Sequence, residues 1–472
     1  MRHRSTFLVL LILSLVPSIA RAHGTLRRSR PAAGATLHEV PRLLRLEFNE
    51  APELAVSSVR LLDARRREIA LSPLRTPGDS LRVVIADVAG QLAAGRYTVQ
   101  WQIAGRDGHP VRGQFDFTIA ADAAGLAPAL PVPVVERPGL APTAGPAMPR
   151  APAPATFDAE SGIYVAIRWA QYVGLLVVIG AVAFRRLVLG AVGREAPDSP
   201  AVADAASRAH RLATLGALLL AASSIARLLA QWTAVRLAAI RPSAMPLERV
   251  VWQTTWGHAW LLQAAALAVL AGGLVLARRG AARDAGGAGW SIAAVATIGL
   301  AFASALSGHA AVPGSALPLV ADAVHILAAG GWMGGLFILL AAGLPAARAL
   351  PEPQRRATMA ALVNAFSPTA LAFAGLVVGT GVLAAWRNVE SPALLLHSPY
   401  GQVLLLKLGA LAVAASIGLY NWRRARPTLA TTGDDAPMRR AMRAELAAGV
   451  VVLVITAVLV AIPTPVDLVR MR

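Results

Sequence analysis

Two histidines and an aspartate stand near the two ends of a short N-terminal region: His23, Asp107 and His109. Residues 1–22 have a basic start, an apolar middle and small residues before His23, which is typical of a secretory signal with an A-x-A cleavage site. Cleavage after Ala22 would make His23 the new N-terminus, so that its α-amine and imidazole would chelate one metal ion together. Asp107 and His109 lie on either side of one glycine and add an oxygen and a nitrogen. A mixed nitrogen and oxygen ligand set of this kind suits Cu(II).

Residues 23–120 have the pattern of a soluble β domain that would hold these ligands. Apolar residues alternate with polar ones in three runs, with the apolar members Leu44, Leu46 and Phe48, then Tyr97, Val99, Trp101 and Ile103, and then Phe115, Phe117 and Ile119. Period-two alternation predicts strands with one buried and one wet face, and Gln102 falls on the wet face. Several such strands in one short region predict an all-β fold, a small barrel or sandwich. The turn from Asp107 to His109 joins two of the strands.

The remainder of the chain is too apolar for a soluble protein. Of its 472 residues, 56% are hydrophobic and 15% are charged. Eight apolar segments approach or exceed the roughly 20 residues that a helix needs to cross a bilayer. They lie at 163–184, 210–232, 256–277, 289–310, 318–343, 364–386, 400–421 and 445–463. The predicted fold is therefore the small β domain followed by an all-α polytopic membrane domain, residues 161–472, with about eight transmembrane helices.

The distribution of arginines predicts how the chain crosses the membrane. The net charge is +19, and arginines gather in the loops after the odd-numbered segments. Such an excess follows the positive-inside rule and places the β domain and both chain ends outside. Residues 121–160 are rich in proline and alanine. They predict a semi-rigid linker that tethers the β domain near the membrane, and such a tether needs no tight docked interface.

Polar residues inside the predicted spans are costly in lipid and need a partner or a function. His258, His309, Asp322 and His325 all fall near the outer ends of their spans. Three imidazoles and a carboxylate on neighbouring spans predict a copper entry site at the outer mouth of the membrane domain. The alternative is that these groups form hydrogen bonds between helices, as polar membrane residues commonly do.

Three further residues of the spans are singled out. Met333 lies within the small-residue stretch 330–335, which predicts close packing between helices. A packing role for Met333 is therefore favoured, and the alternative is that it is a soft ligand of Cu(I). Arg168 and Arg227 fall within the first and second spans and are candidates for pairing between helices, although the sequence names no partner.

The composition also excludes several classes of site. The chain has no cysteine, which excludes disulfides and thiolate metal sites. No methionine occurs between Met1 and Met148, so the β domain lacks the thioethers of a Cu(I) cluster. Nucleic acid is not an expected partner, because no basic patch with interleaved aromatic residues is present.

The motifs of the β domain resemble the periplasmic copper-resistance CopC family. The resemblance rests on His23-Gly24-Thr25-Leu26, on Ser29 to Ala35, on Leu46-Glu47-Phe48, on Trp101 and on Asp107 to Gly113. It implies a Greek-key β barrel in which the Cu(II) ligands match His23, through amine and ring, with Asp107 and His109. The methionine-rich Cu(I) site of some members has no counterpart here.

The membrane part, about 160–463, is similar to the CopD family. The matching pieces are Ser307-Gly308-His309-Ala310, Asp322 with His325, Trp332 to Gly335, Tyr400 to Lys407, Asn421 and Glu445. Nothing carries over to His258. The fused order implies a protein of the bacterial inner membrane with its β domain in the periplasm, which binds Cu(II) there and passes copper inward. The resemblance leaves open the direction, passage as Cu(I), and the involvement of a periplasmic copper carrier or a reductant. It also leaves the oligomeric state open.

Two other functions are consistent with the same residues. One is periplasmic copper sequestration or sensing, with the helices as an anchor. The other is a haem-binding electron-transfer protein in which His309 and His325 are axial ligands. An enzyme is not expected: Asp107 would occupy a coordination position that oxygen activation needs open, and no motif for ATP-driven pumping is present.

Overall fold

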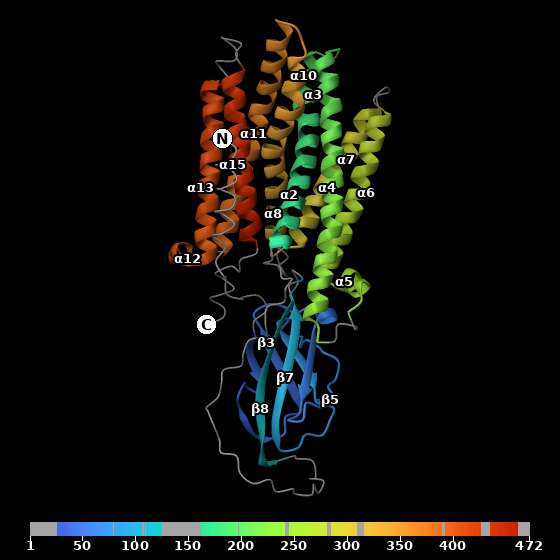
Figure 1. The fold of residues 1–472 in the computed structure, drawn as a ribbon, viewed down its shortest axis with the longest axis vertical. Coiled ribbons are helices and arrows are strands. Elements are labelled where there is room, and N and C mark those ends of the chain that lie inside the picture. The colour runs from blue at the N-terminus through green and yellow to red at the C-terminus, as the bar shows by residue number, and fades with distance from the viewer. Residues whose placement is uncertain are drawn as a thin grey trace.

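The computed structural model describes residues 26–78, 80–105, 108, 110–124, 162–196, 198–240, 245–280, 285–308, 316–388, 392–425 and 435–460. They form a small β domain and a long helical bundle, stacked end to end (Figure 1). The β domain lies against one end of the bundle and leaves the opposite end uncovered by it (Figure 1).

The β domain is a sandwich of two sheets. Its strands are β1 (Leu26–Arg30), β2 (Thr36–Glu39), β3 (Leu43–Phe48), β4 (Ser58–Leu62), β5 (Glu68–Ile69), β6 (Val83–Asp87), β7 (Gly95–Ala104) and β8 (Pro110–Ala124), with a short 3₁₀ turn η1 (Leu54–Val56). One sheet has the order β1-β3-β6 and the other β2-β8-β7-β4-β5. The long β7–β8 ladder pairs antiparallel from Gly95 with Ile119 to Ala104 with Pro110. The turn that carries Asp107 and His109 therefore connects the two longest strands.

The core between the sheets consists of the alternating apolar residues that the sequence predicts. Leu44, Phe48, Val99 and Phe117 are at most 1% exposed. Trp101 packs edge-on against Phe48, with ring centroids 5.2 Å apart. These residues form one contiguous cluster, which gives the domain its own hydrophobic core.

Alternation ends in the last part of β7, where one prediction is wrong. Gln102, expected on the wet face, is fully buried, and its Nε2 donates to the carbonyl of Val56 at 2.9 Å. Val56 and Ala104 belong to a cluster completed by helical residues such as Val251 and Trp256. The far end of β7 is therefore covered on both faces, because the helical bundle packs against it.

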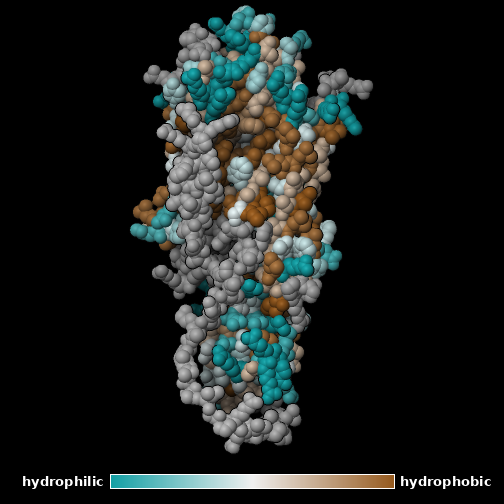
Figure 2. All heavy atoms as spheres, viewed as in Figure 1, coloured by the Kyte–Doolittle hydropathy of each residue, from teal (hydrophilic) through white to brown (hydrophobic). Residues whose placement is uncertain are grey.

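Within the described residues, eight helical segments are long and apolar enough to cross a membrane. They are Gly162–Glu195, Pro200–Ala238, Thr255–Arg279, Gly287–Leu306, Leu317–Arg348, Gln354–Arg387, Pro399–Arg423 and Ala436–Leu459. Their number agrees with the eight spans predicted from the apolar segments, and each overlaps its predicted range. Figure 2 shows a hydrophobic belt over these helices, between a hydrophilic end and the β domain.

Several of these segments consist of more than one element. The elements are α2 (Gly162–Ala183), η2 (Phe184–Val188), α3 (Leu189–Glu195), α4 (Pro200–Ala238), α5 (Leu247–Gln253), α6 (Thr255–Arg279), α7 (Ala285–Leu306), α8 (Leu317–Ala329), η4 (Gly330–Gly334), α9 (Gly335–Ile338), η5 (Leu339–Gly343), α10 (Leu344–Arg348), α11 (Gln354–Asn388), α12 (Pro392–His397), α13 (Pro399–Tyr420), η6 (Asn421–Ala425) and α15 (Ala436–Leu459). Here η2, η4, η5 and η6 are π-helical turns. The short α5 lies beside the β domain, outside the main bundle (Figure 1).

The bundle is held together by close contact of small residues. A Cβ atom on Gly334 would lie 2.0 Å from the carbonyl oxygen of Leu176, so α2 and η4 approach backbone to backbone. Gly180 makes the reciprocal contact with Gly334. This is the packing that the small-residue stretch 330–335 predicts. The side chain of Met333 lies against Gly449 of α15, which is a packing contact as expected for this residue.

Candidate functional site

The three predicted metal ligands of the β domain, His23, Asp107 and His109, lie outside the described residues. Gly108, between the second and the third, is described, and its position fixes where this turn meets the rest of the molecule. Gly108 lies at the junction between the β domain and the helical bundle, where it contacts side chains of α4 and α6.

Glycine is required at position 108 for two independent reasons. Its φ is +83°, a left-handed conformation that costs a residue with a side chain about 1–2 kcal/mol. A Cβ atom there would also lie 2.6 Å from the Nε2 of Gln231 and 3.2 Å from the Trp256 ring. The Nε2 of Gln231 donates a hydrogen bond to the carbonyl of Gly108. The backbone of Gly108 thus lies directly against side chains of α4 and α6.

A second polar contact joins the two parts of the molecule. The Glu53 carboxylate, just before η1, accepts a hydrogen bond from the backbone N–H of Thr255 at 3.2 Å. Thr255 is the first residue of α6, and the Thr254 side chain caps the same helix by accepting from the N–H of Gly257 at 2.9 Å. A carboxylate at a helix N-terminus is favourable because it satisfies a free N–H and complements the helix dipole.

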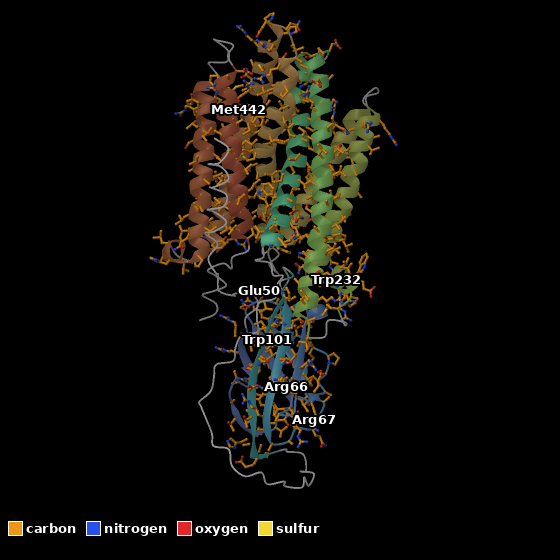
Figure 3. The ribbon with its side chains drawn as sticks, in the orientation of Figure 1. Glu50, Arg66, Arg67, Trp101, Trp232 and Met442 are labelled. Atoms are coloured by element: carbon orange, nitrogen blue, oxygen red, sulfur yellow. The ribbon has the colours of Figure 1, made fainter. Side chains whose placement is uncertain are left out.

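Apolar packing surrounds these two contacts. Val56 and Ala104 of the β domain pack in one cluster with buried residues of the helical part of the chain. These are Leu228, Val235, Ala239, Met245, Val250, Val251 and Trp256. Figure 3 shows Trp232, which flanks this cluster, at the end of α4 next to the β domain. The β domain is therefore docked on the bundle, where the linker composition alone predicted a tether without a tight interface.

A buried polar network continues from the docked turn into the bundle. The Gln231 side chain that binds Gly108 accepts a hydrogen bond from the hydroxyl of Tyr164 on α2 at 3.1 Å. A second polar group lies one turn along α4, where Arg227 donates to Gln171 at 3.3 Å and to Ser307, directly after α7, at 3.2 Å. Ser307 comes two residues before His309, which lies outside the described residues. The two groups lie on successive turns of α4, through Gln231 and Arg227.

Asp322 and His325 lie one helical turn apart on α8, as predicted. The Nδ1 of His325 is 2.9 Å from the hydroxyl of Thr380 on α11, so this histidine bonds between helices. The ammonium of Lys407 on α13 acts electrostatically on both Asp322 and His325. The sequence singled out the histidine and the carboxylate, but Thr380 gave no signal because hydroxyls are common in membrane helices.

His258 of α6 makes its described contact with α5. Its side chain is exposed, and its Nε2 is 2.9 Å from the carbonyl of Trp252 on α5. No three histidine, cysteine or acidic side chains come together as a metal site anywhere in the described part of the chain. His258 thus contacts a carbonyl group of the preceding α5, and its part in the predicted copper entry site stays a prediction.

Within the bundle, Glu445 of α15 is 5% exposed. Its carboxylate accepts from the Trp332 indole at 3.0 Å and from the Asn421 amide at 2.9 Å. These three residues stand at the positions that carry the resemblance of the membrane part. They connect η4, η6 and α15 by hydrogen bonds between side chains.

Three family models match successive parts of the chain. A model described as the CopC domain matches residues 26–120. A model described as the copper resistance protein D-like N-terminal domain matches 158–317, and one described as copper resistance protein D matches 360–459. The chain belongs to the CopC–CopD copper-resistance family. Its CopC part corresponds to the β sandwich and its CopD part to the helical bundle.

Two curated relatives cover the chain to different extents. It is 24% identical over 468 residues to the copper transport protein CutJ of Bacillus subtilis, covering 98% of this chain and 78% of that protein. It is 30% identical over 112 residues to the protein YobA of Escherichia coli K12, covering 24% of this chain and 90% of that protein. Among solved structures, CopC from Methylosinus trichosporium OB3b is 30% identical, with a TM-score of 0.20, covering 21% of this chain and 94% of that chain.

Proposed function

We propose that this protein captures Cu(II) in the periplasm through its β domain and passes copper inward across the bacterial inner membrane. The observation that supports the proposal is the contact of Gly108 with side chains of α4 and α6. Gly108 lies between the two predicted ligands Asp107 and His109 in the sequence. Similarity to a copper transport protein over 98% of the chain supports the same function.

The capture step follows from the chemistry of the predicted ligands. The amine and imidazole of His23, the carboxylate of Asp107 and the imidazole of His109 provide the nitrogen and oxygen donors that Cu(II) prefers. An α-amine has an ordinary pKa of about 7.7–8.0, so metal binding must displace its proton. Copper affinity of the β domain is therefore expected to fall as the pH is lowered.

The transfer step is supported by the docked arrangement. The β domain lies at the end of the bundle opposite α3 and α10 (Figure 1), whose last turns carry Arg194 and Arg348. The positive-inside rule puts those arginines in the cytoplasm and the β domain in the periplasm. Copper released from the turn would then meet the bundle at its outer end, near Ser307 and the predicted ligand His309.

A second candidate function is periplasmic sequestration, with the bundle as an anchor. It is favoured by two observations. The described helical residues contain no group of three histidine, cysteine, aspartate or glutamate side chains. Two arginines, Arg168 and Arg227, also lie beneath the docked turn, where they repel a bare cation. Transport and sequestration predict different copper contents in the cytoplasm.

The experiment is cytoplasmic copper accumulation in cells that make the intact chain, the double variant His309→Ala with His325→Ala, or His258→Ala. The three proteins are compared at matched membrane expression. Transport predicts that the intact chain and His258→Ala raise cytoplasmic copper and that the double variant does not. Equal cytoplasmic copper in all three, with Cu(II) still bound by the exported domain, would rule out this route and favour sequestration.

A further inference from the structure

The outer part of the bundle holds a group of buried hydrogen-bond donors that lack acceptors. They are Nη1 of Arg168 on α2, Nε of Arg227 on α4, and Nε1 of Trp256 and Nε2 of Gln263 on α6. Arg168 is 3% exposed, Gln263 3% and Trp256 1%. Buried donors without acceptors are rare in folded proteins, because each one forfeits its hydration without compensation.

These donors belong to one connected group. The Arg227 guanidinium lies 5.6 Å from the centre of the Trp256 ring and donates to Gln171. Gln171 in turn donates to Gln263 at 2.9 Å. The Arg168 guanidinium lies 5.0 Å from the centre of the Tyr164 ring, and both arginines act electrostatically on Tyr172. Three helices therefore contribute donors to the same region.

The two arginines form no ion pair within the described residues, although Asp322 of α8 also acts electrostatically on Tyr172. No aspartate or glutamate of the described chain lies within ion-pair distance of Arg168 or Arg227. Their described partners are neutral amides, a hydroxyl and aromatic rings. A buried guanidinium is costly unless a counter-charge accompanies it, and two in one place add their mutual repulsion.

We propose that Arg168 and Arg227, with Trp256 and Gln263, bind a small monovalent anion beneath the docked β domain. Each feature of the group points to this ligand: the unmatched atoms are all donors, two of the side chains carry positive charge, and guanidinium and indole N–H groups are strong donors to anions. The group repels a metal cation, because its two guanidinium groups carry positive charge.

The ligand has the chemistry of a halide or of a carboxylate group. A free chloride ion would neutralise part of the arginine charge permanently. A carboxylate brought in as a ligand of copper would instead accompany the metal past the two arginines. The anion site is independent of the proposed copper route, and its test needs no copper. A negative result for the anion site therefore does not contradict copper transport, and the reverse also holds.

The test is thermal unfolding of the purified, metal-free full chain in detergent, at constant ionic strength. Sodium isethionate, a bulky and weakly coordinating salt, is replaced stepwise by sodium chloride or by sodium acetate. The inference predicts a saturable rise of the Tm, because a ligand that binds only the folded state stabilises it. A rise with chloride identifies a halide site, and a rise with acetate identifies a carboxylate site.

Variants then locate the effect. Arg168→Gln and Arg227→Gln are expected to abolish the saturable rise. Arg236→Gln is the matched control, since Arg236 also lies on α4 over a tryptophan ring, at 5.3 Å, but is exposed. If neither chloride nor acetate raises the Tm of the wild-type chain in a saturable way, the inference is overturned. This result does not depend on whether the variants fold. Persistence of the rise in both Arg168→Gln and Arg227→Gln, or its loss in Arg236→Gln, would also overturn the inference.

Discussion

At the scale of single residues, Gly108 connects the chemistry of the β domain with the bundle. The sequence singled out its neighbours Asp107 and His109 as ligands and explained the glycine only as part of a turn. The structure adds that its conformation is left-handed and that its backbone carbonyl accepts from Gln231. The contact was not predictable, because Gly108 and Gln231 are far apart in sequence and neither has a pattern that names the other.

Gly108→Ala is expected to disturb the docking of the β domain as well as strain the turn. The strain alone costs about 1–2 kcal/mol, and the added methyl group would also displace Gln231 and Trp256. Gly34→Ala is the matched control, because Gly34 has a φ of +76° with no heavy atom within 4 Å of its would-be Cβ. Limited proteolysis of the linker is expected to be faster in Gly108→Ala than in Gly34→Ala. Equal rates would show that the contact with the helices adds nothing.

Asp116 makes the stability of the β domain depend on pH. Burial raises the pKa of its carboxyl, but hydrogen bonds from Thr98 and Arg96, both at 2.5 Å, outweigh burial and lower it below the ordinary value of 3.8. A carboxyl with a lowered folded pKa stabilises the fold above its unfolded pKa, and this contribution is lost as the pH falls through the folded pKa.

Asp116→Asn should therefore lower the free energy of unfolding at about pH 6 and narrow the difference from wild type at about pH 3. Urea titration of the detergent-solubilised chain at the two pH values measures this. Asp122→Asn, which removes an exposed contact with His38 at 3.2 Å, is the control and should change neither value appreciably. A deficit in Asp116→Asn that is the same at both pH values would contradict the assignment.

At the scale of elements, the sequence predicts most of the architecture. The lengths of the apolar segments predict all eight spans, because a helix needs about 20 mostly apolar residues to cross a bilayer. The strands β3, β7 and β8 follow from alternation of apolar residues. Prediction failed at Gln102, where a partner element decides exposure. η1 and α4 to α6 cover the end of β7, and α5 supplies the carbonyl that His258 contacts.

The contact between α2 and η4 is expected to tolerate no side chain. Gly334→Ala would bring a methyl group against the Leu176 carbonyl and force the two elements apart, which costs about 1–3 kcal/mol. Gly375→Ala on α11 has open space around it and should be neutral or stabilise the helix by up to about 1 kcal/mol. Thermal unfolding in detergent distinguishes the two variants. A Tm for Gly334→Ala equal to or above that for Gly375→Ala would show that the packing is looser than described.

At the scale of the whole molecule, the docked β domain is the feature that composition could not predict. The composition of a proline-rich linker predicts how far the linked domain can reach. It does not predict whether that domain packs against the bundle. The interface depends on residues drawn from η1, β7, α4 and α6, and it places the turn at residue 108 on the bundle. In Figure 3, Trp232 lies at the junction between the β domain and the bundle, whereas Arg66 lies farther from the bundle, within the β domain.

Cysteine cross-linking can test the docked arrangement, because the chain has no native cysteine. The pair Glu53→Cys with Thr255→Cys is expected to react with a short bifunctional thiol reagent, since the Glu53 carboxylate contacts the N–H of Thr255. The pair Arg66→Cys with Thr255→Cys should remain unlinked under the same conditions. Equal cross-linking of the two pairs would indicate a domain that moves freely on its tether.

The most direct test of the central claim is copper entry into proteoliposomes that contain the intact chain with its β domain facing outward. Cu(II) is supplied outside, with and without a reductant, and lumenal copper is measured over time. The account predicts uptake by the intact chain and loss of uptake in Asp107→Ala with His109→Ala. Copper that stays bound outside while the lumen remains empty, under both conditions, would contradict transport and leave a membrane-anchored copper-binding protein.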